Sequence, residues 1–282
     1  MADRRILETA YCEQRVLFTR HDNNAAGGEA RECLAEERRA MSSKYRARES
    51  IAGTKQSNSA VSPFNDLAAE YDAWFDKEGS FIFFIEVQAF KGLLPSLLKP
   101  WLEIGVGSGR FAQALGIEAG IDPSIKLIEM ARRRGINAFL GRGEEELFDE
   151  ESFGTVFLIV TLCFLDSPLK VLKEANRILM PSGKIVLGLV MKESPWGRFY
   201  QQKKVEGHRF YKYATFYSYD EVIKLIVQAG FVTEKIVSTL FQKPGELHSV
   251  EEPREGYFPD AGFTIIVAGK RPAIEGKQKD YR

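Results

Sequence analysis

Short apolar runs alternate with helix-like stretches from about residue 100 onward. A brief apolar run bounded by turn residues is typical of a buried strand, whereas apolar residues three and four positions apart indicate a helix. The runs predict seven strands, at residues 101–104, 119–121, 137–140, 155–161, 184–190, 231–241 and 263–267. Helical spacing predicts helices at residues 111–115, 125–134, 168–179 and 220–229. This alternation predicts an α/β fold with a doubly wound, mostly parallel seven-stranded sheet.

Two further helices are predicted before the first strand. Aromatic and aliphatic residues recur at helical intervals from Phe64 to Phe75, and a second apolar run extends from Phe81 to Phe90. We expect residues 61–98 to cap the open end of the sheet and to wall off a pocket. Tyr71 and Trp74 are candidates to line that pocket, because each carries a polar group that a dry core disfavours.

Residues 1–60 differ from the rest of the chain. They are rich in Arg, Glu, Ala and Ser and contain few large apolar residues after Phe18. This composition predicts a charged N-terminal extension, helical or disordered, that is dispensable for catalysis. Residues 271–282 are polar and predict a frayed tail, so the folded domain is expected to span residues 61–270.

The first predicted strand ends in a glycine-rich turn. Gly105, Gly107 and Gly109 alternate with Val and Ser, so a ligand can approach the main chain closely and meet free backbone N–H groups. A dinucleotide fingerprint needs its third glycine one position later, where Arg110 stands. A diphosphate is therefore not the first expectation, and a tight turn without a ligand remains an alternative.

Asp122 stands at the end of the second predicted strand, followed by Pro123 and Ser124. Ligands of doubly wound sheets bind beyond the carboxyl ends of adjacent strands, so Asp122 is expected to face the glycine turn. A carboxylate there can accept two hydrogen bonds from a ribose diol, worth roughly 1.5–3 kcal/mol each. The alternative is that Asp122 only caps the following helix. The upstream glycines favour ribose binding.

Four motifs occur in one order along the chain: WLEIGVGSG at residues 101–109, GIDPS at 120–124, GRGEEELFDEESFGTV at 141–156 and RILMPSGKIVLGLV at 177–190. With them, residues 64–270 resemble the class I S-adenosylmethionine-dependent methyltransferases of the small-molecule type. The segments YDAWF, VTLCFLDSP and PGELHSVEEPREGY are similar to a group of small bacterial and archaeal methyltransferases without a settled substrate. The resemblance implies a Rossmann-like fold, S-adenosylmethionine as cofactor and methyl transfer to a small-molecule acceptor.

The resemblance also implies which residues bind the cofactor: Glu103, Gly105, Gly107 and Gly109 for the methionyl part, Asp122 for the ribose, Ile121 and Pro123 beside the adenine, Gly143 and Glu144 at its edge, and Val160 and Thr161 near the sulfur. One position departs from the family. Many relatives place an aspartate where this chain has Arg142, which leaves the adenine contact open. A run of carboxylates such as residues 144–146 is also typical of a solvated surface.

An aromatic-rich insertion at residues 192–219 follows the fifth predicted strand and is expected to form a lid. It suits an apolar, aromatic or cationic acceptor, or it packs on its own aromatic residues. Candidate residues for the acceptor pocket are Tyr71, Trp74, Cys163, Phe164, Tyr200, His208 and Tyr211. His208 is either a general base or a solvated loop residue. Methyl transfer is an in-line displacement that positioning can drive, so no catalytic residue is assigned.

Composition limits which partners, metal sites and functions this chain is expected to have. Lys plus Arg and Asp plus Glu each number 39 in 282 residues, which gives no electrostatic case for a nucleic-acid or membrane partner. Three widely spaced cysteines argue against disulfides or a zinc site, so no metal is expected and a cytoplasmic location fits. Two other functions stay open, an NAD-dependent oxidoreductase and a non-catalytic cofactor-binding or partner-binding protein. The acceptor atom and the oligomeric state are not predicted.

Overall fold

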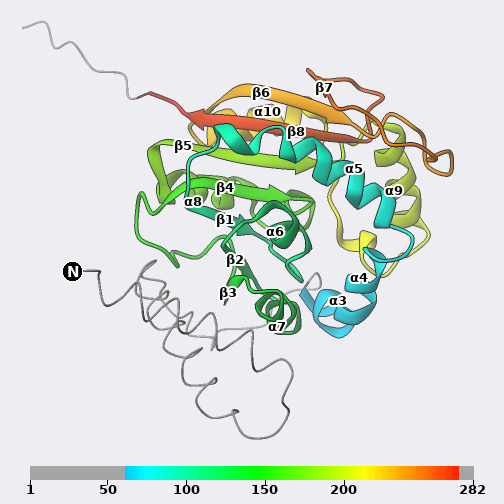
Figure 1. Ribbon diagram of the computed structural model, residues 1–282, viewed down its shortest axis with the longest axis horizontal. Helices are drawn as coiled ribbons and strands as arrows, with labels where there is room; N and C mark the ends of the chain where they lie inside the picture. Colours follow the sequence, from blue (N-terminus) through cyan, green and yellow to red (C-terminus); the bar gives the residue numbers. More distant parts are fainter. Residues whose placement is uncertain (1–60, 273–282) are drawn as a thin grey trace, which may run out of the picture. The chain divides into compact units, whose positions relative to one another are not determined.

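The computed structural model describes residues 61–272, which form one eight-stranded sheet flanked by helices (Figure 1). The strand order is β3-β2-β1-β4-β5-β8-β6-β7. The strands are β1 (Trp101–Ile104), β2 (Ala119–Asp122), β3 (Asn137–Leu140), β4 (Phe153–Ile159), β5 (Leu179–Leu189), β6 (Phe231–Thr239), β7 (Arg254–Glu255) and β8 (Phe263–Lys270). β1 to β5 are parallel, and β8 is antiparallel to both β5 and β6. The predicted mostly parallel sheet is confirmed.

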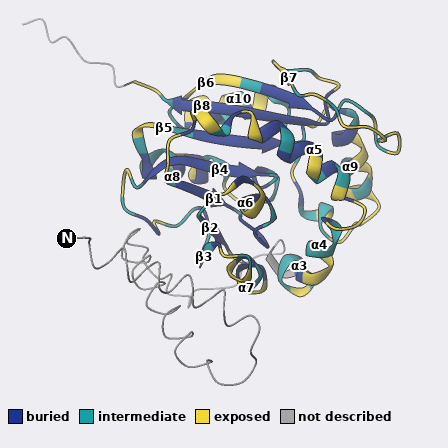
Figure 2. Cartoon of the chain, viewed as in Figure 1, coloured by how far each residue is buried: buried dark blue, intermediate teal, exposed yellow. Residues whose placement is uncertain are grey.

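The helices that follow the strands are α6 (Arg110–Leu115), α7 (Ile125–Arg133), α8 (Pro168–Ile178), α9 (Pro195–Val205) and α10 (Tyr219–Gln228). Before β1 lie α3 (Val61–Asp66), α4 (Ala68–Trp74), α5 (Ser80–Lys91) and the short 3-10 helix η1 (Leu94–Ser96). Most buried apolar side chains of α5, α6 and α7 belong to one apolar cluster with residues from the strands. α8 and α10 pack together behind the sheet, and the strands between these layers are largely buried (Figures 1 and 2).

Local sequence explains where several elements begin. The β4 residues are all buried, as their continuous apolar pattern predicts for a central strand. Ser124 caps α7 by accepting a hydrogen bond from the Leu127 amide. Ser218 and Glu221 form a reciprocal capping box at the start of α10. These signals lie in short segments, which is why the sequence predicts these elements well.

The structure corrects three predictions. The first N-terminal helix is divided at Leu67, whose backbone leaves helical geometry between α3 and α4. The strand predicted at residues 184–190 begins earlier, at Leu179, because Pro181–Gly183 also lie inside β5, where the pairing with β4 shifts register. An eighth strand of two residues, β7, pairs with β6 and was not predicted. The predicted extension at residues 1–60 and the tail beyond residue 272 lie outside the described residues.

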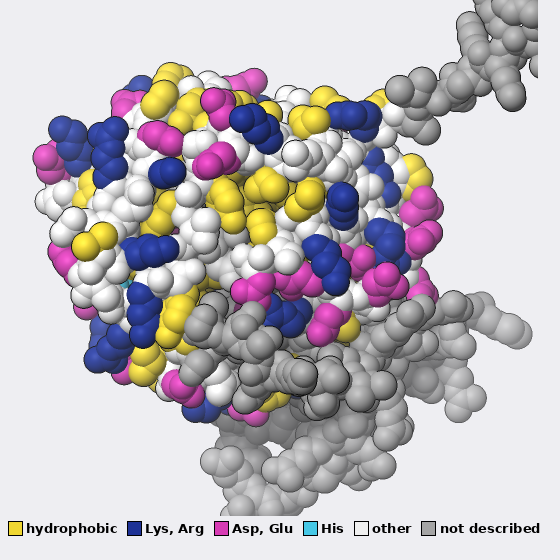
Figure 3. All heavy atoms as spheres, turned by 180° about the vertical axis from the view of Figure 1, so that it is seen from behind, with side chains coloured by type: hydrophobic (Ala, Val, Ile, Leu, Met, Phe, Trp, Pro, Cys, Tyr) yellow, Lys and Arg dark blue, Asp and Glu magenta, His cyan; other side chains and the backbone are white. Residues whose placement is uncertain are grey.

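The surface carries mixed charge. From behind, Lys and Arg side chains are interspersed with Asp and Glu around apolar patches (Figure 3). This pattern differs from the single-sign stripe that marks a nucleic-acid-binding face. None of the helices within residues 61–272 is long and apolar enough to cross a membrane.

Candidate active site

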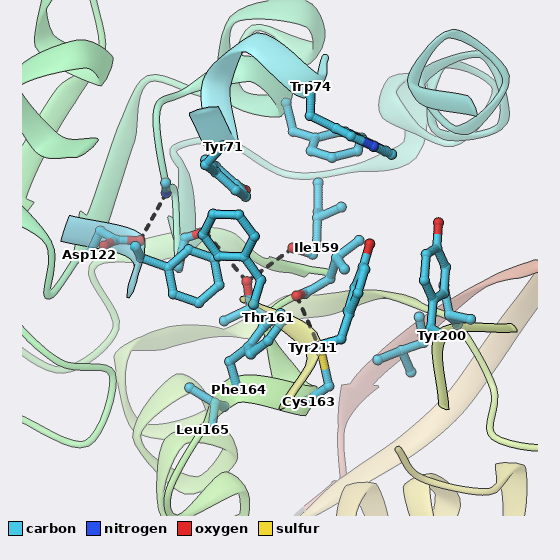
Figure 4. Close-up of a pocket in the computed structure, with 18 of the residues that line it drawn as sticks. Tyr71, Trp74, Asp122, Ile159, Thr161, Cys163, Phe164, Leu165, Tyr200 and Tyr211 are labelled. Atoms are coloured by element: carbon cyan, nitrogen blue, oxygen red, sulfur yellow. Dashed lines mark hydrogen bonds between the residues drawn. The ribbon is translucent and has the colours of Figure 1, made fainter. Parts of the chain in front are cut away.

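A continuous cavity of about 950 Å³ opens at the carboxyl ends of β1, β2, β4 and β5. The residues predicted to bind the cofactor or the acceptor all line it, with the exception of Gly109. Figure 4 shows Asp122 at one side of this cavity and Tyr200 at the other, with Tyr71, Thr161 and Tyr211 between them. Pockets for one small molecule span roughly 300–1,000 Å³. The cavity lies at the upper end of that range, and its two unlike ends suit two different chemical groups.

The glycine turn after β1 uses its backbone amides within the protein. The Gly105 amide donates to the Ile121 carbonyl at 2.8 Å, and the Gly107 amide donates to Asp122 Oδ2 at 3.0 Å. The Gly109 amide bonds within the turn at 2.9 Å. The expectation that these amides face a ligand is therefore wrong, because neighbouring elements already satisfy them. A diphosphate would find no free N–H group at these three positions.

Two of the glycines are required by the backbone and by close packing. Gly105 has φ +78°, and a Cβ there would lie 2.3 Å from Thr161 Cγ2. Gly107 has φ +54°, and its Cβ would lie 3.3 Å from the Tyr71 hydroxyl. L-residues rarely adopt such φ values. The turn therefore packs between Thr161, which follows β4, and Tyr71, which lies on α4.

Glu103 is the first of three carboxylates at this end of the cavity. Its side chain is 2% exposed, and Oε2 has no hydrogen-bond partner within the described residues. Burial and the nearby Asp122 charge raise the pKa of Glu103 well above its usual range. An unpaired buried carboxylate is unfavourable, so Glu103 favours a ligand that donates hydrogen bonds or carries positive charge.

Asp122 stands opposite the glycine turn, as predicted. It is 8% exposed and accepts hydrogen bonds from the Gly107 amide and, at 2.8 Å, from the Ser124 amide. Burial raises the pKa of Asp122 to about 6, although these two amides act in the opposite direction. The alternative that Asp122 only caps the next helix is wrong, because the Ser124 hydroxyl occupies that position.

The three consecutive carboxylates after β3 have different environments. Glu144 lines the cavity, and its buried Oε1 has no hydrogen-bond partner within the described residues, whereas Glu146 is exposed. Arg142 lies 3.6 Å from Glu144 and also pairs with Asp166. The run is therefore not a uniformly solvated surface, and Arg142 replaces the usual aspartate with a cation that is bound to neighbouring acids.

The remaining candidates at this end are mainly apolar. Ile121 is buried and Pro123 exposed, and both line the cavity beside Asp122. Gly143 fits closely against Ile104, because a Cβ there would lie 2.8 Å from Ile104 Cγ2. Gly143 thus serves packing as well as lining the cavity. These surfaces suit the faces and edge of a planar ring.

Val160 follows β4 in a strained conformation. Its φ is +52°, which is exceptional for a β-branched residue, and its amide donates to the Gly188 carbonyl at 2.9 Å. The next residue, Thr161, donates from Oγ1 to the Ile159 carbonyl at 3.0 Å. Strain of this kind persists where the surroundings over-determine the backbone, commonly at functional sites. It places Val160 and Thr161 at the junction between the two ends of the cavity.

Aromatic side chains dominate the other end. Trp74 on α4, Tyr200 on α9 and Tyr211 on the short 3-10 helix η3 (Tyr211–Tyr213) line it, and the rings of Tyr200 and Tyr211 lie 4.5 Å apart (Figure 4). His208 lines the rim and is exposed; burial, then Lys203 and Arg209, lower its pKa. The predicted lid therefore faces the cavity as well as packing on itself.

Cys163 and Phe164 lie in the short 3-10 helix η2 (Leu162–Phe164) after Thr161. The Cys163 thiol lies 3.6 Å from the Val160 carbonyl, and burial raises its pKa to about 12. The thiol therefore stays protonated and is a poor nucleophile at neutral pH. Within residues 61–272, no group of three or more His, Cys, Asp and Glu residues is arranged to hold a metal ion.

Two features of the site were not predicted. Glu86, the only charged residue between Phe81 and Phe90 in a helix that seemed purely apolar, lines the aromatic end. Asp72 on α4 also bonds Arg110 at 2.8 Å and Arg134 at 2.7 Å, which ties the N-terminal helices to the glycine turn. A lone charge inside an apolar run was the available signal for Glu86. The Asp72 cluster joins segments that are far apart in sequence.

The geometry limits what the carboxylate end can bind. Glu103 and Glu144 each present an unpaired oxygen, and Asp122 lies between the glycine turn and the start of α7. Such a site suits a ligand with an ammonium or sulfonium charge, a diol and an amino-bearing ring. It repels an anionic diphosphate, which argues against the dinucleotide alternative. S-adenosylmethionine carries all of the favoured groups.

Comparison with known proteins agrees with this chemistry. Residues 102–187 match the family described as a methyltransferase domain. A Thermotoga maritima protein of known structure, described as an S-adenosylmethionine-dependent methyltransferase and possible histamine N-methyltransferase, is 40% identical with a TM-score of 0.68, over 74% of this chain and 99% of that chain. An uncharacterised protein of Methanocaldococcus jannaschii is 38% identical over 207 residues, 73% of this chain and 98% of the other. One from Mycobacterium tuberculosis is 37% identical over 203 residues, 71% of each. The chain therefore belongs to the S-adenosylmethionine-dependent methyltransferases, and S-adenosylmethionine is its cofactor.

Proposed function

We propose that this chain transfers the methyl group of S-adenosylmethionine to a small-molecule acceptor, with the cofactor at the carboxylate end of the cavity and the acceptor at the aromatic end. The observation that carries the proposal is the pair of unpaired carboxylate oxygens, on Glu103 and Glu144, on either side of Asp122. They complement a cationic ligand rich in hydrogen-bond donors. The aromatic residues at the other end of the cavity are complementary to the acceptor and not to the cofactor.

Each residue at the carboxylate end then has a distinct task. Glu103 accepts hydrogen bonds from the cofactor's ammonium group, Asp122 accepts them from the ribose hydroxyls, and Glu144 accepts one from the adenine amino group. Ile121 and Pro123 flank the adenine ring, with Gly143 at its edge. When bound, S-adenosylmethionine supplies an activated methyl group on a sulfonium sulfur.

Val160 and Thr161 hold the junction where the two bound molecules meet. Their backbone is fixed by the bonds to Gly188 and Ile159 described above, so the gap between the two ends has a defined width. Positioning of this kind can lower a barrier by roughly 7–11 kcal/mol in favourable cases. The enclosing aromatic residues exclude water from the acceptor.

The acceptor is a small molecule because its end of the cavity is walled on several sides. The N-terminal helices contribute Tyr71 and Trp74, and the segment after β5 contributes Tyr200 and Tyr211. These walls leave a pocket and not an open face. The description of the Thermotoga relative as a possible histamine N-methyltransferase makes histamine one acceptor to test.

Calorimetric titration with S-adenosylmethionine and S-adenosylhomocysteine tests the cofactor site. Asp122→Asn keeps an oxygen that can accept a backbone hydrogen bond but removes the charge, so we expect the affinity for both compounds to fall about tenfold, or 1.4 kcal/mol. Asp260→Asn, at an exposed position, is the matched control and is expected to bind as the unaltered chain does. Equal affinities in the two variants would contradict the ribose assignment.

Methyl transfer itself needs a second assay, with radiolabelled S-adenosylmethionine and a metabolite extract. Label in a small organic product supports the enzyme. A chain that binds both compounds and labels no acceptor would instead be a non-catalytic binding protein of the same fold.

A further inference from the structure

Glu86 is a buried carboxylate at the aromatic end of the cavity. It lies within α5 between Ile85 and Val87, and its side chain is 5% exposed. Within the described residues, its carboxylate makes no hydrogen bond or ion pair, although it lines the cavity. Burial raises the pKa of Glu86 to about 8. A carboxylate in this position destabilises the fold, so packing does not explain its presence.

The basic residues around the cavity do not neutralise Glu86. Within residues 61–272, each Lys or Arg that lines the cavity is paired with another acid: Arg110 with Asp72, Arg142 with Asp166, Lys203 with Glu206 and Arg209 with Glu70. The exposed His208 contacts the Tyr211 ring, with centroids 4.7 Å apart. A positive charge that complements Glu86 must therefore come from a bound molecule.

Aromatic rings surround this position. Tyr200 lies 6.0 Å from the Trp196 ring and 4.5 Å from the Tyr211 ring, measured between centroids. Glu86 and these three rings line the same cavity. Burial raises the pKa of both Tyr200 and Tyr211, and the charge of Glu86 adds to both shifts. Ring faces attract cations by roughly 0.5–2 kcal/mol. A buried carboxylate in a cavity lined by these tilted rings suits an organic cation.

We propose that the acceptor is a small primary or secondary amine, with its ammonium group paired to Glu86 and its carbon skeleton packed against the rings of Tyr200 and Tyr211. This inference rests on the proposed function and extends it by naming the acceptor class and the acceptor atom. Glu86 is the residue that selects an amine over a neutral compound of the same shape.

In the empty cavity Glu86 carries a proton near neutral pH, because its pKa is about 8, and a bound ammonium group displaces that proton to water by stabilising the carboxylate. The carboxylate then prepares the amine for reaction. Glu86 accepts one proton from the ammonium group, and this frees the nitrogen lone pair. The nitrogen then forms a bond to the methyl carbon while the carbon–sulfur bond breaks, and its electron pair stays on sulfur. The products are the methylated ammonium and S-adenosylhomocysteine. Glu86 then releases its proton to water, so atoms and charge balance.

The test measures binding to the full chain saturated with S-adenosylhomocysteine. The probes are benzylamine, 2-phenylethylamine and tryptamine, each compared with the alcohol of the same skeleton. We expect at least one amine to bind about tenfold more tightly than its alcohol, and Glu86→Gln to reduce that preference to about threefold or less. Glu78→Gln, which removes an exposed carboxylate at the same cavity, is expected to keep the preference.

Two binding results would overturn the inference: no amine binds better than its alcohol, or Glu86→Gln keeps the full preference. S-adenosylhomocysteine binding is measured first in each protein. If the unaltered chain does not bind it, the proposed function itself fails, whereas binding without an amine preference removes only the inference. Equal S-adenosylhomocysteine affinity in Glu86→Gln shows that the variant is folded. A Glu86→Leu variant that unfolds more readily than the unaltered chain would also overturn the inference, by revealing a structural role.

Discussion

The burial of Glu86 predicts how stability depends on pH. In the folded chain the pKa of this carboxyl is raised from its usual 4.5 to about 8. Between these values the unfolded chain ionises Glu86 while the folded chain keeps the proton. The unfolded state therefore binds fewer protons, and the free energy of unfolding falls as pH rises through this window. The stabilising effect of protonation is complete below about pH 4.5 and is lost toward pH 8.

The size of the effect follows from the width of the window. Each pH unit reduces the free energy of unfolding by up to about 1.4 kcal/mol, so the full shift gives an upper limit near 5 kcal/mol. Water that enters the cavity solvates part of the carboxylate, so we expect about 2–3 kcal/mol. Glu86→Gln carries no titrating group at this position. The free energy of unfolding of Glu86→Gln, relative to that of the unaltered chain, is therefore expected to increase with pH.

The assay is urea unfolding of both proteins, without ligand, at about pH 5 and about pH 8. Asp122 and Glu103 have raised pKa values of the same sign, but both proteins contain them, so their contribution cancels in the difference. Tyr200 and Tyr211, the titratable groups near Glu86, stay neutral in this range because their pKa values are raised. Parallel stability curves for the two proteins would refute the reasoning.

Two further predictions concern the glycine turn and its anchor. Gly105→Ala forces a Cβ into Thr161 at φ +78°, so we expect a loss of at least about 1–3 kcal/mol in urea unfolding and weaker S-adenosylhomocysteine binding; an unchanged midpoint would contradict this. Asp72→Asn removes the charge that bonds two arginines, and we expect about 1–3 kcal/mol of destabilisation. Asp76→Asn, which changes the exposed partner of Arg110, is the control. An equal loss of stability in both variants would show that the burial of Asp72 does not strengthen its ion pairs.

Local patterns predicted the sheet and the place of the carboxylate end of the cavity. The strand-end positions of Glu103 and Asp122 follow from short apolar runs, because parallel strands bring their carboxyl ends to one edge. The binding roles of these residues stay predictions. The division of the first helix at Leu67 could not be predicted, since its apolar spacing continues unbroken on both sides.

Long-range contacts decided what the sequence could not show. The glycine spacing suggested room for a ligand, yet Gly105 is explained by Thr161, which lies 56 positions away in sequence. Arg110 appeared only as a departure from a dinucleotide motif, and its bonds to Asp72 became visible in the folded chain. Glu86 was hidden by its apolar neighbours, which made the whole helix resemble core.

The cavity has ends of separate origin. The carboxylate end is built on loops that follow β1, β2 and β3, whereas the aromatic end comes from α4, α5 and the segment of α9 and η3. Mutations in the helical walls are therefore expected to alter the aromatic end without disturbing the loops of the carboxylate end. Residues 68–91 and 195–213 are thus the two short segments in which substitutions reshape the aromatic end alone.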